Sequence, residues 1–216
     1  MTRVKICGIK EEAHALAAAE AGADFIGLIF ASSKRQVTPA QAEKIAAAVK
    51  KSGYATKVVG VFVNVSSMLV NKIADFCHLD WVQLSGDETW EYCREITKPL
   101  IKVIPVSRQQ SPQEIGNALA TGARVLKNQK HVYLLDSRVK GKYGGTGMTF
   151  DWSLAGPAAE QFPVIIAGGL TPENVAQVIK AVAPWGVDVS SSVEVGGVKS
   201  VEKIRAFIRA VRSVEE

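Results

Sequence analysis

Short apolar runs recur along the whole chain, separated by longer segments with helical character. Most runs are almost continuously apolar and rich in Val and Ile, as strands buried on both faces of a parallel sheet should be. The pattern predicts eight strands: RVKIC (3–7), DFIGLIF (24–30), KVVGVFV (57–63), DWVQLS (80–85), LIKVIPV (100–106), HVYLLD (131–136), PVIIAGG (163–169) and GVDVSS (186–191).

The segments between these runs place apolar residues at helical spacing, which predicts a buried face on each helix. The two clearest sets are Ala13, Leu16, Ala17 and Ala21, and Val175, Val178, Ile179 and Val182. A helix therefore follows the first strand, and another precedes the last.

Three helix starts are marked by a hydroxyl residue followed by proline. Thr38 and Ser111 each begin a capping box, closed three positions later by Gln41 and Glu114. Thr171 repeats the cap and the proline without the box residue, which predicts that a helix starts directly after it.

Eight strand–helix units in 216 residues leave about 27 residues for each unit, a fair length for a strand, a helix and two loops. This predicts one α/β domain over residues 1–216, a (β/α)8 barrel of the TIM type. An open doubly wound sheet would need a phosphate loop after the first strand, and ICGIK is not one.

Composition excludes several classes of protein. The cysteines Cys7, Cys77 and Cys93 are widely spaced and form no CxxC, which argues against a disulfide framework or a zinc site and predicts a reducing, cytoplasmic location. No apolar run approaches the ~18 residues of a membrane span, and the N-terminus has no signal-peptide core. The net charge of +5 is scattered, which favours a small anionic substrate over nucleic acid or a membrane.

Residues capable of chemistry collect at the predicted strand ends, where such barrels hold their active sites. They are Cys7 after the first strand, Asp136 after the sixth, Gly168 and Gly169 after the seventh, and Asp188, Ser190 and Ser191 at the eighth. Taken singly, a buried cysteine is often only a small hydrophobic residue, and an aspartate can simply cap a loop. Their common position predicts one site.

The glycines of AGGLTPENV expose backbone N–H groups just before a predicted helix, which favours a phosphate site. The loop after the eighth strand adds the hydroxyls of Ser190 and Ser191. The glycine-rich segment KGKYGGTGMTF (140–150) lacks a dinucleotide fingerprint, and we interpret it as a mobile lid.

An ordered set of motifs covers nearly the whole chain: VKICGIK, GVFVN, VQLSGDE, LLDS, YGGTG-x-x-FDW, IIAGGLTPENV and GVDVSS. Together they closely resemble the phosphoribosylanthranilate isomerase family of tryptophan biosynthesis. The resemblance implies a cofactor-free and metal-free Amadori rearrangement. It would convert N-(5-phosphoribosyl)anthranilate to 1-(2-carboxyphenylamino)-1-deoxyribulose 5-phosphate.

The resemblance also implies roles for individual residues. Cys7 matches the general base of the family and Asp136 its general acid. Arg35 matches the arginine that binds the anthranilate carboxylate. The phosphate loops fall on Gly168 with Gly169 and on Ser190 with Ser191, and Asp188 is counted with the substrate-binding residues. A thiolate at Cys7 would be favoured by backbone N–H groups at the start of the following helix.

The chain departs from the family pattern at Ser85, usually histidine, at Gln36, commonly aromatic, and at Ser192, usually glycine. We expect Ser192 to keep the glycine conformation, with positive φ and some strain. A related sugar-phosphate isomerase, such as the aldose–ketose isomerase of histidine biosynthesis, remains open, as does a non-catalytic phosphosugar-binding barrel. The expected assembly is a monomer or a homodimer.

Overall fold

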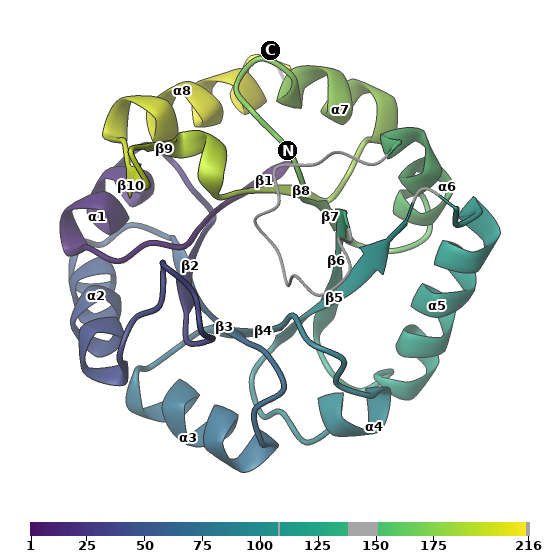
Figure 1. Cartoon of the computed structure of the whole chain (residues 1–216), viewed down its shortest axis with the longest axis horizontal. Helices are drawn as coiled ribbons and strands as arrows, with labels where there is room; N and C mark the ends of the chain where they lie inside the picture. The colour runs from purple at the N-terminus through teal and green to yellow at the C-terminus, as the bar shows by residue number, and fades with distance from the viewer. Residues whose placement is uncertain (108, 138–150, 215–216) are drawn as a thin grey trace.

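The computed structural model describes residues 1–107, 109–137 and 151–214. Within these residues, eight parallel strands close into a barrel in chain order, with β1 beside β8 (Figure 1). The strands are β1 (Arg3–Cys7), β2 (Phe25–Ile29), β3 (Lys57–Phe62), β4 (Trp81–Leu84), β5 (Leu100–Val106), β6 (His131–Ser137), β7 (Val164–Ile166) and β8 (Gly186–Val189). All eight predicted strands and the (β/α)8 barrel are thus confirmed.

Helices form a ring around the barrel (Figure 1). They are α1 (Glu12–Glu20), α2 (Pro39–Lys51), α3 (Ser67–Phe76), α4 (Trp90–Cys93), α5 (Pro112–Val125), α6 (Gly156–Ala159), α7 (Val175–Val182) and α8 (Val201–Arg212), with short 3₁₀ helices η1 (Trp152–Ala155) and η2 (Ser191–Val193). A small antiparallel hairpin, β9 (Glu194–Val195) with β10 (Val198–Lys199), follows η2. The sequence pattern did not predict this hairpin, because each strand has only two residues.

Two of the three predicted helix starts are confirmed. Thr38 and Ser111 both form complete capping boxes, with proline at the start of α2 and of α5. The start predicted after Thr171 is wrong, because α7 begins only at Val175. The side chain of Asn174 accepts a hydrogen bond from the N–H of Thr171 and donates one to the carbonyl of Gly169. These bonds close a turn where the helix was expected.

The predicted buried face is correct for α7, whose Val175, Val178, Ile179 and Val182 are all buried. It is wrong for α1, where the buried residues are Ala15, Ala18 and Ala19. The helix is so rich in alanine that its apolar residues do not single out one face, and packing against α2, α8 and β2 decides the rotation.

Two apolar clusters fill the described part of the molecule. The larger lies between the strands and the helices, and the smaller fills the inside of the barrel with Phe25, Val59, Trp81, Ile101, Val132, Leu134, Ile165 and Ala167. Towards the carboxyl ends of the strands, polar and charged side chains such as Gln83, Asp136 and Asp188 join the apolar ones around a cavity. In the described part of the chain, no helix has the length and apolar character needed to cross a membrane.

Candidate active site

A cavity of about 670 Å³ opens at the carboxyl ends of the strands. Five of the predicted site residues line it: Cys7, Arg35, Asp136, Asp188 and Ser190. Its remaining wall is mainly apolar, from β2 to β6, with the amide of Gln83 and the hydroxyl of Ser85. Gly168, Gly169 and Ser191 are not part of the lining. The strand ends therefore bring together the predicted base and acid.

Cys7 is the last residue of β1 and is only 6% exposed. Gly27 of β2 stands beside it, and a Cβ on this glycine would lie 2.8 Å from the Cys7 Sγ. The glycine thus leaves room for the thiol. Burial raises the pKa of the Cys7 thiol, although Lys5 opposes the effect. The thiol form is therefore favoured in the free protein, and the help expected from backbone N–H groups does not offset the burial.

Lys5 and Asp188 form a buried ion pair inside the barrel. They are direct neighbours in the register of β1 and β8, and the Lys5 Nζ lies 3.0 Å from the Asp188 Oδ1. Burial by itself would lower the pKa of Lys5, but Asp188 and Cys7 outweigh burial and raise it. Lys5 therefore carries a positive charge directly below the cavity.

Asp136 lies near the end of β6, which β7 and β8 separate from β1 in the closed barrel. Burial and the neighbouring Asp188 carboxylate raise the pKa of Asp136 to about 6. A carboxyl group with this pKa is protonated in an appreciable fraction of molecules near neutral pH, so it can donate a proton.

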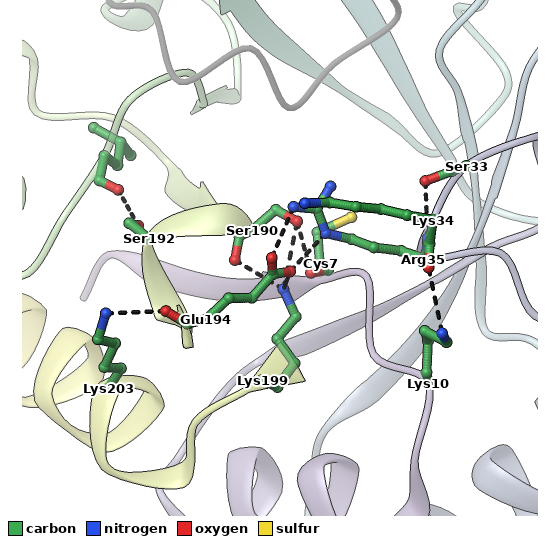
Figure 2. Close-up of polar contacts among 11 residues, drawn as sticks. Cys7, Lys10, Ser33, Lys34, Arg35, Ser190, Ser192, Glu194, Lys199 and Lys203 are labelled. Carbon is green, nitrogen blue, oxygen red and sulfur yellow. Dashed lines mark hydrogen bonds and ion pairs between the residues drawn. The ribbon is translucent and has the colours of Figure 1, made fainter. Parts of the chain in front are cut away.

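Arg35 lies in the loop after β2 and is fixed by a two-pronged ion pair (Figure 2). Its Nε and Nη2 donate to the two carboxylate oxygens of Glu194, at 2.6 and 2.9 Å. The arginine side chain passes over Gly8, whose φ is +79° and whose Cβ, if present, would lie 2.5 Å from the Arg35 Cδ. Glu194 occupies the edge of the guanidinium formed by Nε and Nη2, so the N–H groups of Nη1 and the second N–H of Nη2 point away from it.

Lys199 connects this ion pair to the tip of β1 (Figure 2). Its ammonium donates to Glu194 at 2.9 Å and to the carbonyl of Ser190 at 2.8 Å. The Ser190 hydroxyl in turn donates to the carbonyl of Cys7 at 3.1 Å. Arg35, the hairpin and Cys7 therefore belong to one hydrogen-bonded network.

Gly168 and Gly169 both adopt positive φ, 86° and 69°, in the turn after β7. Among the described residues, neither of their N–H groups has a hydrogen-bond partner. Free N–H groups in a left-handed turn suit an anion. α7 begins further along the chain than expected, so these free donors belong to the turn and not to the N-terminus of the helix.

The expectation for Ser192 is wrong, because it does not have positive φ and lies within η2. Its hydroxyl donates to the carbonyl of Leu170, which joins the loop after β8 to the loop after β7. A glycine could not make this bond. At the other departures, the Gln36 amide donates to the carbonyl of Phe30, and the Ser85 hydroxyl accepts from Gln83.

The predicted lid, residues 140–150, lies outside the described residues. In the part that is described, His, Cys, Asp and Glu do not gather into a group able to hold a metal ion. Lys5, Glu194 and Lys199 were missed from the sequence. Lys5 could have been identified, because a lysine in a buried strand two residues before a candidate base is unusual. Glu194 could not, because its partner Arg35 is 159 residues away in the sequence.

Comparison with known sequences gives one family. The sequence model of "N-(5'phosphoribosyl)anthranilate (PRA) isomerase" matches residues 4–210. The chain is 44% identical over 215 residues to the N-(5'-phosphoribosyl)anthranilate isomerase of Dehalococcoides mccartyi, covering 100% of this chain and 98% of the relative. It is 47% identical to the isomerase of Roseiflexus castenholzii, covering 97% and 98%.

Solved structures give the same result. The phosphoribosyl anthranilate isomerase of Thermotoga maritima superimposes with a TM-score of 0.82 at 37% identity, over 99% of this chain and 100% of that one. Another isomerase structure, in complex with reduced 1-(o-carboxyphenylamino)-1-deoxyribulose 5-phosphate, has a TM-score of 0.79 at 35% identity, over 99% and 100%. A further structure describes monomers generated from the dimeric Thermotoga maritima enzyme, with a TM-score of 0.81 at 35% identity, over 99% and 100%.

Proposed function

This chain belongs to the N-(5'-phosphoribosyl)anthranilate isomerase family, and we propose that Cys7 is the general base and Asp136 the general acid of its reaction. The protein is an isomerase of tryptophan biosynthesis. The observation that carries the two assignments is that both side chains line one cavity, from strands separated by β7 and β8.

In the first step, protonated Asp136 donates its proton to the furanose ring oxygen of the substrate. The bond from C1 to that oxygen breaks, and the nitrogen lone pair forms the C1=N bond of a Schiff base. The pKa of about 6 supports this role, because an ordinary aspartate would be almost fully ionised at neutral pH.

In the second step, the Cys7 thiolate removes the proton from C2. The electrons of the C2–H bond form the C1=C2 bond, and those of the C1=N bond return to nitrogen. The resulting enolamine becomes the ketone when C1 gains a proton and the C2 hydroxyl loses one. The sequence of steps is an internal redistribution of electrons, so it balances without an external oxidant or reductant.

The two ends of the substrate hold the reacting carbons between base and acid. Arg35, already oriented by Glu194, supplies its remaining N–H groups to the anthranilate carboxylate. Gly168 and Gly169 supply backbone N–H groups to the phosphate, with Ser190 and Ser191 from the facing loop. Asp188 borders the sugar from the cavity floor. The complex of a relative with reduced product supports a binding site for the whole phosphosugar in this fold.

The test is turnover of purified Cys7→Ala and Asp136→Asn variants. General acid and base contributions are worth roughly 10²–10⁴-fold each, so kcat should fall by at least about 100-fold in either variant. Cys77→Ala is the matched control, since it removes a buried thiol at the end of α3 and should leave kcat unchanged. Near wild-type kcat in a folded Cys7→Ala protein would remove Cys7 from the mechanism.

The assembly and location remain proposals. Thermotoga maritima provides a relative described as dimeric, which favours a homodimer over a monomer for this chain. Light scattering at micromolar concentration would decide between them. The cytoplasmic location expected from the cysteines stays a prediction.

A further inference from the structure

Lys5 is a cation enclosed within the barrel, with a side chain only 1% exposed. A buried ammonium is costly unless it is paired, and Asp188 pairs it at 3.0 Å. Replacing such a pair with apolar residues often leaves stability unchanged or improves it, so packing alone does not explain a charged pair here. The position directly below the cavity suggests a role in the chemistry.

The Lys5 ammonium also lies beside the Cys7 thiol. Successive residues of a strand alternate between faces, so Lys5 and Cys7 point to the same side of β1. The space beside Gly27 on the neighbouring strand shows how close the two side chains lie. A Cβ at this glycine would lie 2.8 Å from the Cys7 Sγ and 3.2 Å from the Lys5 Nζ. The missing side chain thus leaves one shared space for the thiol and the ammonium.

Among the described residues, four charged groups act on Cys7 from the elements packed around it. Lys5 of β1 and Lys199 of β10 favour the thiolate, as does Arg35 from the loop after β2, and Asp188 of β8 opposes it. Lys199 and Arg35 are already bound to Glu194, which offsets their charge. Lys5 is also paired, to Asp188, but it is the cation that hydrogen-bonds the Cys7 thiol, and its charge lowers the pKa of Cys7 more than that of Lys199 does.

We propose that Lys5 is a positioning residue for the general base, whose ammonium, held by Asp188, stabilises the thiolate form of Cys7. The proposal rests on the assignment of Cys7 as the base. Lys5 keeps its proton throughout, because Asp188 and the thiolate both favour its charged form. Cys7 alone takes the C2 proton, and Lys5 acts only through its charge.

The test is the rate at which iodoacetamide alkylates Cys7 in the folded protein, measured from pH 6 to 10 by peptide mass spectrometry. Lys5→Met removes the positive charge with little change in length, and should slow alkylation of Cys7 at pH 7 by about tenfold or more, one pKa unit. Asp188→Asn removes the opposing negative charge and should accelerate it. Opposite effects of the two substitutions would show that charge controls the alkylation rate of Cys7, because loss of structure would change both rates in the same direction.

Cys77 and Cys93, both fully buried, serve as internal controls, since their alkylation reports opening of the fold. If Lys5→Met exposes them, Asp188→Asn is used instead: it leaves the Lys5 charge without its counter-charge, and faster alkylation of Cys7 while Cys77 and Cys93 stay protected supports the proposal. An unchanged Cys7 profile in folded Lys5→Met, or slower or unchanged alkylation in Asp188→Asn, overturns it. Failure of the base assignment would appear separately, as full turnover in Cys7→Ala with the alkylation results intact.

Discussion

Glu194 is the residue whose substitution should most clearly reveal the buried charge network. Its side chain is 5% exposed and receives hydrogen bonds from Arg35 at 2.6 and 2.9 Å and from Lys199 at 2.9 Å. Glu194→Gln keeps the size of the side chain and removes its charge. The change leaves two neighbouring buried cations without their common anion.

Breaking a buried ion pair by removing one partner costs about 3–5 kcal/mol, because the remaining charge stays buried. The amide that replaces the carboxylate retains one acceptor oxygen, so we expect the lower end, a loss of about 3 kcal/mol in the free energy of unfolding. A domain of this size loses roughly 2–4 °C in Tm for each kcal/mol, which predicts a decrease of about 6–12 °C.

The assay is urea denaturation followed by circular dichroism, with Glu20→Gln as the matched control. Glu20 makes an ion pair with Arg205 in which the side chains are 56% and 46% exposed, so the same substitution should cost about 0–1 kcal/mol. Equal losses in the two variants, or a loss below about 1 kcal/mol for Glu194→Gln, would refute the reasoning.

The difference between wild type and Glu194→Gln should also depend on pH. Burial alone would raise the pKa of Glu194, but the hydrogen bonds from Arg35 and Lys199 outweigh burial and lower it. The stabilisation by the carboxylate is therefore complete above the ordinary glutamate range and is lost as pH falls through the lowered pKa of the folded state. A difference that grows on acidification would contradict this sign.

The site supports three further predictions. The pKa of Asp136 is about 6 and that of Cys7 is raised, so kcat/KM should rise about tenfold per pH unit up to pH 6, as the fraction of Cys7 thiolate grows. Between pH 6 and the pKa of Cys7 it should stay level, because the fraction of protonated Asp136 falls as fast as the fraction of thiolate rises, and above the pKa of Cys7 it should fall. A steady decline from pH 6 would show that Cys7 is already ionised there. Arg35→Ala should weaken product binding by about 2–5 kcal/mol in calorimetry, and unchanged affinity would place the anthranilate carboxylate elsewhere. Ser192→Gly should lower the free energy of unfolding by about 1–2 kcal/mol through loss of the hydrogen bond to Leu170 and gain of chain freedom; higher stability would contradict the observed conformation.

The barrel was predictable from sequence because its signals are local. Strands buried on both faces produce nearly continuous apolar runs, and Thr38 and Ser111 carry their own capping partners three residues away. Where the local signal was ambiguous, the prediction was wrong. The first helix has alanines on several faces, so the sequence did not show which face is buried. Thr171 begins a turn that the Asn174 side chain closes, and not a helix.

The candidate site was predictable to the extent that strand ends converge on one mouth. Cys7 and Asp136 were placed correctly in the shared cavity, since both lie at the ends of strands. The network around them was not predictable, because the partners are far apart in sequence: Arg35 meets Glu194 across 159 residues and Lys5 meets Asp188 across 183. Only the closed barrel fixes which charges become neighbours.

The central claim is that Cys7 and Asp136 act on one bound phosphosugar from different sides. The most direct measurement is a crystal structure of this protein with reduced 1-(2-carboxyphenylamino)-1-deoxyribulose 5-phosphate. The account predicts the Cys7 Sγ about 3–3.5 Å from C2 and an Asp136 carboxyl oxygen about 2.6–3.2 Å from the C4 hydroxyl, the former ring oxygen. Either group out of reach of its atom, with the ligand held at Arg35 and at the glycine turn, would contradict the account.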